Sequence, residues 1–222
     1  MIKAVFFDLD GTLLDRDSSL SHFISSQYER FYEHFSHIDK ETFMTKFIDL
    51  DCNGYLWKDV VYQELIKQFN VENLTIEQLL ADYIHMFPEH CIPFPNVKRL
   101  LAGLKKKGIK IGIITNGKEL FQQKNIDSLQ INTFFDSVLI SEKEGLRKPD
   151  PRIFQKGLTD LNVKAEEALF IGDHIENDVY GAQQVGMLGI WKRNNKEQRS
   201  IVSHYIDDLM EVLTYCDESL YV

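Results

Sequence analysis

The stretch that decides the fold lies near the start of the chain and reads Ile2-Lys3-Ala4-Val5-Phe6-Phe7-Asp8-Leu9-Asp10-Gly11-Thr12-Leu13-Leu14. Its first half is apolar without a polar face, which is typical of a strand in a parallel sheet covered by helices on both sides. Asp8 and Asp10 follow at the carboxyl end, where open α/β sheets bind their ligands. Two like charges about 4 Å apart repel by roughly 4 kcal/mol at an effective dielectric constant near 20. The pair therefore predicts a bound cation, a shared proton, or both.

The composition of the chain permits such a fold and excludes other classes. The chain has 222 residues, 44% of them hydrophobic, and a net charge of −9. The negative charge argues against nucleic acid or an anionic membrane as the main partner, and no run reaches the ~20 apolar residues of a membrane span. Cys52, Cys91 and Cys216 are odd in number and lack CxxC spacing, which predicts reduced thiols in a cytoplasmic protein. We expect a small-molecule partner and leave monomer and homodimer open.

Helical spacing replaces the strand pattern between residues 16 and 94. Apolar residues recur at helical spacing in four stretches, near residues 20–35, 43–48, 60–69 and 76–87, and Thr75 with Gln78 resembles a capping box. We interpret residues 16–94 as an inserted helical cap over the acidic loop; the alternative is a set of ordinary helices without a gating role. Lys46, Trp57 and Lys58 are expected to be packing and surface residues rather than substrate contacts.

Strands and helices alternate through the rest of the chain. After the first strand, four strand-like runs lie at residues 109–114, 138–140, 168–173 and 188–191, with helical patterns between them and a last helix near residues 208–215. This alternation predicts an α/β fold with a doubly wound parallel sheet. Residues 1–15 and 95–222 then form the main domain.

Polar residues follow these strands at the edge where parallel strands end together. Thr115 and Asn116 follow the second strand, Asp173 and Asp178 the fourth, and Lys148 lies in the loop after the third. Mg²⁺ prefers carboxylate, phosphate and water oxygens. The predicted metal ligands are Asp8, Asp10 and Asp173, and the predicted phosphate ligands are the Thr115 hydroxyl, the Asn116 backbone N–H and Lys148.

Four segments together resemble the haloacid dehalogenase-like superfamily of phosphohydrolases. The segments are Asp8-Leu9-Asp10-Gly11-Thr12-Leu13, Thr115-Asn116-Gly117, Lys148-Pro149-Asp150 and Gly172-Asp173-His174-Ile175-Glu176-Asn177-Asp178, in the order of the family's four motifs. The resemblance implies the branch with a helical cap between the first two motifs, and a Rossmann-like sheet with strand order 5-4-1-2-3.

The resemblance also implies a role for each acid. Asp8 would attack phosphorus and form an aspartyl-phosphate. Asp10 would protonate the leaving oxygen, then activate water, and would lend its backbone carbonyl to Mg²⁺. Asp173 would bind the metal, and Asp178 would support it or orient its neighbours. His174 is interpreted as a supporting residue, because Mg²⁺ prefers oxygen.

The predicted function is a Mg²⁺-dependent phosphatase for a small phosphorylated metabolite, such as a sugar phosphate or nucleoside monophosphate. Phosphosugar mutases share all four motifs and remain an alternative, as do 2-haloacid dehalogenases, although Asp10 and the metal ligands favour phosphate. Phosphonate hydrolases, which need an additional lysine in the cap, also remain open. From another class, a regulatory module switched by phosphorylation of Asp8 remains open, although such modules are shorter and lack the insertion.

Overall fold

The computed structural model describes residues 1–194 and 202–217, and the chain forms two compact units. One unit comprises Met1–Asp15 and Pro93–Val222, and the other comprises Arg16–Ile92. The main domain was expected to resume at residue 95. Pro93 pairs with Leu14 in an isolated bridge, and the backbone N–H of Phe94 donates to the carbonyl of Leu13 at 2.9 Å. These contacts join the returning chain to the acidic loop two residues earlier.

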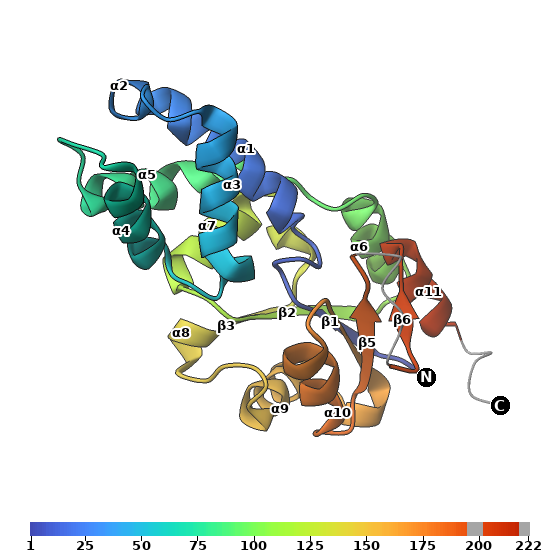
Figure 1. The fold of residues 1–222 in the computed structure, drawn as a ribbon. Coiled ribbons are helices and arrows are strands. Elements are labelled where there is room, and N and C mark those ends of the chain that lie inside the picture. The colour runs from blue at the N-terminus through green and yellow to red at the C-terminus, as the bar shows by residue number, and fades with distance from the viewer. Residues whose placement is uncertain (195–201, 218–222) are drawn as a thin grey trace. The chain divides into compact units, whose positions relative to one another are not determined.

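A parallel sheet forms the centre of the first unit (Figure 1). Its strands lie in the order β3-β2-β1-β4-β5-β6. The doubly wound fold is confirmed, and the observed order contains the expected 5-4-1-2-3 with one addition. The sixth strand escaped prediction because it has only two residues and adds to the edge beside β5. The strand bounds are β1 Ala4–Phe7, β2 Lys110–Thr115, β3 Ser137–Ile140, β4 Ala168–Gly172, β5 Leu188–Lys192 and β6 Tyr205–Ile206.

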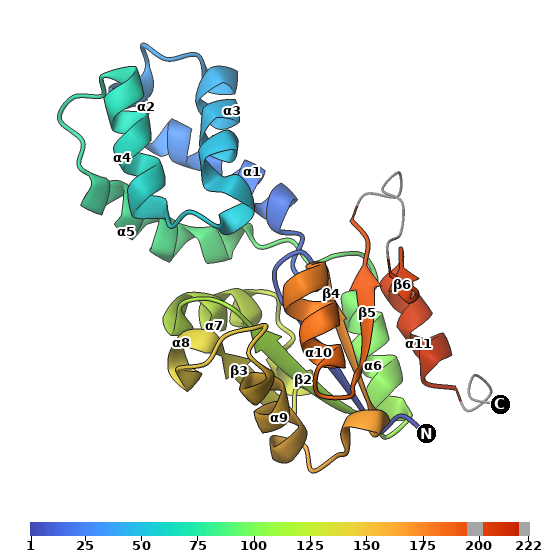
Figure 2. The same cartoon turned by 60° about the horizontal axis from the view of Figure 1, so that its bottom comes forward.

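Helices cover both faces of this sheet, as right-handed crossovers between parallel strands require. The helical elements of this unit are α6 Val97–Lys106, α7 Glu119–Ser128, η3 Asn132–Phe134, α8 Ser141–Glu144, α9 Pro151–Asp160, η4 Ala165–Glu167, the π-helical segment η5 Ile175–Tyr180, α10 Gly181–Gln183, η6 Leu209–Glu211 and α11 Val212–Tyr215. Helices α6 and α7 lie on one side of the sheet, and α9 and α10 lie on the other (Figures 1 and 2). The sequence pattern predicts one helix after β4. The structure has two elements there, the π-helical segment η5 and the short helix α10.

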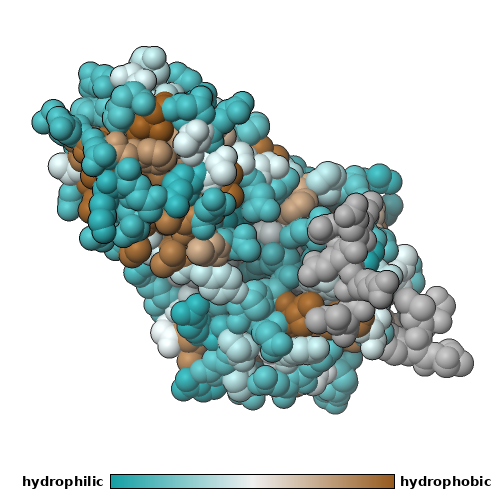
Figure 3. Space-filling model, viewed as in Figure 1, coloured by the Kyte–Doolittle hydropathy of each residue, from teal (hydrophilic) through white to brown (hydrophobic). Residues whose placement is uncertain are grey.

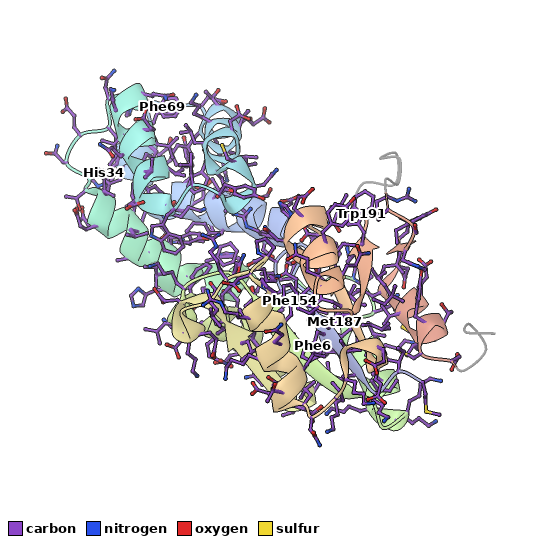
Figure 4. All side chains as sticks on the ribbon, turned by 90° about the horizontal axis from the view of Figure 1, so that it is seen from below. Phe6, His34, Phe69, Phe154, Met187 and Trp191 are labelled. Atoms are coloured by element: carbon purple, nitrogen blue, oxygen red, sulfur yellow. The ribbon has the colours of Figure 1, made fainter. Side chains whose placement is uncertain are left out.

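The core beneath α9 and α10 explains why β1 carries no polar residue. All four of its residues are fully buried. Phe6 points into a cluster with Phe154 and Met187, and the three labels lie close together in Figure 4. The ring of Phe154 meets that of Phe170 edge-on at a centroid distance of 5.1 Å. Burying a side chain of this size stabilises the fold by about 1.5–3 kcal/mol. This packing fixes the position of β1, and therefore of the two acids that follow it.

The second unit is helical throughout, apart from its turns. Its elements are α1 Arg16–Arg30, α2 Tyr32–Phe35, α3 Lys40–Asp51, η1 Cys52–Gly54, α4 Lys58–Phe69, α5 Ile76–Met86 and η2 Phe87–His90. The continuous first helix expected through Phe35 is wrong, because Phe31 leaves helical geometry at φ −110° and ψ 25°. The break lets Phe35 pack against Phe43 at a centroid distance of 4.5 Å. The capping box of Thr75 and Gln78 is confirmed.

A buried ionic cluster lies inside this helical unit. Asp51 accepts two hydrogen bonds from Nη2 of Arg16, at 2.9 and 2.7 Å, and also pairs with Nζ of Lys58. The side chains of Asp51 and Lys58 are each only 2% exposed. Burial opposes ionisation of Asp51, but the two cations outweigh it and lower its pKa. Lys58 is thus a packing residue, as expected, but a buried and ion-paired one; Trp57 packs its ring against Tyr83.

In the view of Figure 3 most residues are hydrophilic, and apolar residues gather in smaller groups. Within residues 1–194 and 202–217, no helix is long and apolar enough to cross a membrane. Cys52, Cys91 and Cys216 are free thiols, as the odd number predicted.

Candidate functional site

The carboxyl ends of β1 and β4 bring the candidate acids together. The two strands pair in register, Phe7 opposite Ile171, and the N–H of Asp8 donates to the carbonyl of Ile171 at 2.9 Å. Asp8 therefore emerges beside the loop that carries Asp173. Single carboxylate oxygens of Asp8, Asp173 and Asp178 all lie within 4.8 Å of one another.

Lys148 reaches this acid group from the loop between α8 and α9, which follow β3. Its ammonium lies 2.6 Å from Oδ1 of Asp8 and 2.6 Å from Oδ1 of Asp178. The lysine side chain is 3% exposed. Burial opposes its charge, but Asp178 and Asp8 outweigh this and raise the pKa of Lys148. Lys148 is thus a permanent cation between two carboxylates.

One lysine does not balance the negative charge of this group. Burial, followed by the charge of Asp178, raises the pKa of Asp8 from 3.8 to about 7 despite the opposing effect of Lys148. Burial, followed by the charge of Asp8, raises the pKa of Asp173 well above its ordinary value. Two buried carboxylates and the half-buried one of Asp173 share one ammonium, so the charge of the group favours a further cation.

The donor set fits a divalent metal of the hard type. Asp8 and Asp173 offer carboxylate oxygens, and Mg²⁺ takes such oxygens with water and phosphate to complete its shell. The third acid of the group, Asp178, is already committed elsewhere. Its Oδ1 accepts from Lys148, and its Oδ2 accepts the N–H of His174 at 3.0 Å. Asp178 therefore fits the expected supporting position.

The π-helical segment η5 explains how Asp178 reaches the site. His174 caps the start of this segment, with Nδ1 accepting the N–H of Asn177 at 3.1 Å. The wider turn directs Asp178 back to the end of β4, where a Cβ on Gly172 would collide with its carboxylate. Such π-helical turns are rare and concentrate at functional sites.

Gly11 permits an equally close approach on the opposite side of the site. It adopts a φ of +77°, and a Cβ there would collide with the carboxylate of Asp173. Only glycine accepts both the left-handed backbone and the contact. The glycine after the two acids is thus needed for the loop of β1 to meet the loop of β4.

The residues after β2 line the same edge. Thr115 ends this strand and is 1% exposed. The Asn116 side chain makes two hydrogen bonds to the backbone of Lys148. Its Nδ2 donates to the Lys148 carbonyl at 3.0 Å, and its Oδ1 accepts the Lys148 N–H at 2.9 Å. Asn116 therefore holds the lysine loop with its side chain, a task that the sequence did not predict for it.

The structure thus brings all seven predicted site residues into one compact unit. Asp8, Asp178 and Lys148 are in direct contact, Asp173 adjoins them, and Asn116 touches Lys148. Asp10 and Thr115 are linked through a residue that the sequence analysis missed. Nε2 of Gln122 donates to Oδ2 of Asp10 at 2.7 Å and to Oγ1 of Thr115 at 2.8 Å.

Two residues at the end of β5 were also missed. The indole N–H of Trp191 donates to the carbonyl of Asp173 at 2.9 Å, and Nδ2 of Asn194 donates to the carbonyl of Gly11 at 2.9 Å. Both hold site loops through the backbone. A sequence shows no signal for such contacts beyond the position of these residues at a strand end.

Comparison with known proteins agrees with this arrangement. The model of the haloacid dehalogenase-like hydrolase family matches residues 5–191. This span includes all but the first residue of β1 and the last residue of β5, the inserted helices and all seven predicted site residues.

Similar proteins share most of the chain. It is 31% identical to the glyceraldehyde 3-phosphate phosphatase of Pyrococcus furiosus over 96% of this chain and 92% of that protein. It is 33% identical to the protein of the same name from Pyrococcus abyssi, over 88% and 83%. Among solved structures, a phosphatase of this superfamily from Thermococcus onnurineus has a TM-score of 0.70 at 28% identity, covering 97% of this chain and 98% of that one.

Proposed function

Because the chain belongs to the haloacid dehalogenase-like hydrolases and is a phosphatase of phosphorylated metabolites, we propose that it works through an aspartyl-phosphate on Asp8. One observation carries this proposal: Asp8 lies 2.6 Å from Lys148, beside Asp173 and Asp178, with Asp10 two residues further on. A carboxylate held by one cation next to an acid-rich group suits nucleophilic attack on a phosphate ester.

In the first step, an oxygen of the Asp8 carboxylate attacks phosphorus, and the bond from phosphorus to the ester oxygen breaks. Asp10 gives its proton to the departing oxygen, so the alcohol leaves neutral. Lys148 and the hydroxyl of Thr115 offset the negative charge of the transferred group, as preorganised donors do in phosphoryl transfer. The product of this step is phosphorylated Asp8 and free alcohol.

In the second step, water attacks phosphorus and passes its proton to Asp10. The bond from phosphorus to Asp8 breaks, which restores both carboxyl groups and releases inorganic phosphate. Asp8, Asp173 and the backbone carbonyl of Asp10 would hold Mg²⁺, with Asp178 supporting. Bound Mg²⁺ supplies positive charge that reduces the repulsion between the Asp8 carboxylate and the phosphate.

The proposed substrate is a small phosphorylated metabolite. The names of the two Pyrococcus relatives make glyceraldehyde 3-phosphate the first compound to test, followed by other sugar phosphates and nucleoside monophosphates. We propose that the helical unit Arg16–Ile92 acts as the cap that selects among them, in a cytoplasmic enzyme.

The direct test is phosphate release from p-nitrophenyl phosphate, with Mg²⁺ and with EDTA. We expect activity only with Mg²⁺ and no turnover in Asp8→Asn. Asp10→Asn should lose roughly 10²–10⁴-fold in turnover, the usual contribution of acid–base catalysis, because the second step needs Asp10 as base even for a leaving group that needs no proton. Asp127→Asn is the matched control, because Asp127 lies on the exposed side of α7. Undiminished turnover in Asp8→Asn would reject the nucleophile.

A metabolite panel separates the neighbouring activities. Release of phosphate supports the proposal. Isomerised sugar phosphate without free phosphate would identify a mutase, and halide released from 2-haloacids would identify a dehalogenase. A phosphorylated Asp8 that never turns over would identify a regulatory module.

A further inference from the structure

Gln122 on α7 is buried against the two residues that handle protons and phosphate in the proposed reaction. It is 1% exposed, although glutamine usually lies at the surface. Its Nε2 donates to Oδ2 of Asp10 at 2.7 Å and to Oγ1 of Thr115 at 2.8 Å. The next glutamine, Gln123, instead bonds Asp127 on the same helix.

The amide of Gln122 is held in one orientation. Nδ2 of Asn125, which is fully buried, donates to Oε1 of Gln122 at 3.3 Å. A Cβ on Gly117 would lie only 2.7 Å from Cγ of Gln122, so this glycine leaves space for the side chain. The reverse orientation would place Nε2 of Gln122 against Nδ2 of Asn125, two donors without an acceptor. The N–H groups therefore face Asp10.

The two N–H donors of this amide determine which oxygens of Asp10 and Thr115 act as acceptors. A side-chain amide has two N–H donors, and both are used at short distance, one on Asp10 and one on Thr115. Because Oδ2 of Asp10 is engaged by this hydrogen bond, Oδ1 is the oxygen available for the proton exchange of the proposed reaction. Oγ1 of Thr115 also accepts, so its own hydrogen points to another acceptor.

We propose that Gln122 is a positioning residue for phosphate-ester hydrolysis. It makes Oδ1 of Asp10 the oxygen that gives and takes the proton, and it turns the Thr115 hydroxyl so that this group donates to the substrate phosphate. This inference rests on the proposed function, in particular on Asp10 as the acid and base. No bond to Gln122 forms or breaks during the reaction.

The experiment compares two phosphate esters in Gln122→Met, which keeps the side-chain length and removes the donors. A nitrophenolate leaves without a proton, whereas an alkoxide needs one. We expect kcat/KM to fall by roughly 10- to 100-fold for n-propyl phosphate, the usual worth of a hydrogen bond to a charged group. The fall for p-nitrophenyl phosphate should be much smaller, because this ester loses only the contact of the oriented Thr115 hydroxyl. Gln123→Met, the matched control on the same helix, should leave both values unchanged.

A double-mutant cycle separates this role from a purely structural one. In an Asp10→Asn background, Gln122→Met should cost little more for n-propyl phosphate, because both changes remove the same proton transfer. Equal losses for the two esters, or full additivity with Asp10→Asn, would overturn the proposal. If Asp10→Asn alone leaves turnover unchanged, the proposed function fails instead.

Gln122→Glu provides a second variant if the methionine chain does not fold, as judged by its thermal melt. A glutamate of equal length cannot donate to Asp10 when ionised, so the same preference for the nitrophenyl ester is expected. Wild-type values for both esters in Gln122→Glu would equally reject the role.

Discussion

Lys148 in the sheet unit and Lys58 in the helical unit are both almost fully buried, yet their carboxylate partners differ in number. Lys58 and Arg16 both pair with the carboxylate of Asp51, so two cations meet one carboxylate in this pairing. Lys148 shares Asp8 and Asp178, with Asp173 adjoining, so anions are in excess. The pKa of Asp51 is lowered, whereas the pKa values of Asp8 and Asp173 are raised.

This contrast distinguishes the Asp51 cluster, which stabilises packing, from the Asp8 group, which is suited to chemistry. Asp51 is ionised and satisfied by groups already present, and nothing more is needed for the helices to fold around it. In the Asp8 group, three carboxylates meet the ammonium of Lys148, so negative charge is in excess there. A perturbed pKa in this direction is therefore a better guide to function than burial of a charged pair alone.

We expect the largest difference in the free energy of unfolding when one aspartate of each cluster is replaced by asparagine. Asp51→Asn leaves two cations in the helical unit without their shared carboxylate and should reduce the free energy of unfolding by about 3–5 kcal/mol. Asp178→Asn removes one of three acids, so in EDTA it should leave stability unchanged or higher. Urea unfolding of both variants measures this, and equal destabilisation would erase the distinction between the clusters.

Replacing each lysine tests the same contrast through catalysis. Lys148→Met should lower kcat for p-nitrophenyl phosphate by roughly 10²–10³-fold, the usual cost of losing one preorganised charge donor. Lys58→Met leaves the pair of Arg16 and Asp51 in place and should keep the rate close to that of the wild type. A comparable rate loss in Lys58→Met would place the helical cluster in the reaction.

Metal binding should stabilise only the unit with excess acid. At 100 times its dissociation constant, a ligand that binds only the folded state adds about 2.7 kcal/mol. Mg²⁺ should therefore raise the Tm of the wild type and of Asp51→Asn, and should not raise that of Asp173→Asn. The thermal melts are run with EDTA and with Mg²⁺, and a shift retained in Asp173→Asn would place the metal elsewhere.

The pH dependence of the metal-free protein is a further expected effect. Folded Asp8 keeps its proton up to a pKa of about 7, whereas the unfolded chain loses it near 3.8. The folded state binds more protons in this window, so stability falls as pH rises from about 4 to about 7, by at most about 1.4 kcal/mol per pH unit.

Urea midpoints measured in EDTA at several pH values test this slope. Asp8→Asn should flatten it, while Asp51→Asn should not, because the lowered pKa of Asp51 belongs to a different pH range. A slope of the opposite sign in the wild type would contradict the raised pKa of Asp8.

The sheet and the acids at its edge were predictable, because both follow from local patterns. Apolar runs that end in Asp8 and Asp173 specify buried strands and the edge where they meet. The placement of Gln122 was not predictable, since α7 carries two adjacent glutamines and only the packing of the helix selects the inner one. The break at Phe31 likewise depends on contacts with distant aromatic rings.

Buried ionic contacts escaped prediction for a related reason. Lys58 and Asp51 stand seven residues apart on different helices, and nothing local marks either as buried. Asp178 was recognised through its spacing from Asp173, but the π-helical turn that delivers it depends on His174 and Gly172.

The central place of β1 has a consequence for the order in which the protein is made. Ala4 pairs with Lys110 on one side and with Ala168 on the other, so β1 leaves the ribosome long before either neighbour exists. The helices of Arg16–Ile92 pack mainly on one another and can assemble meanwhile. Asp8 is thus synthesised early, but it can contact Lys148 and Asp173 only after most of the chain has been made.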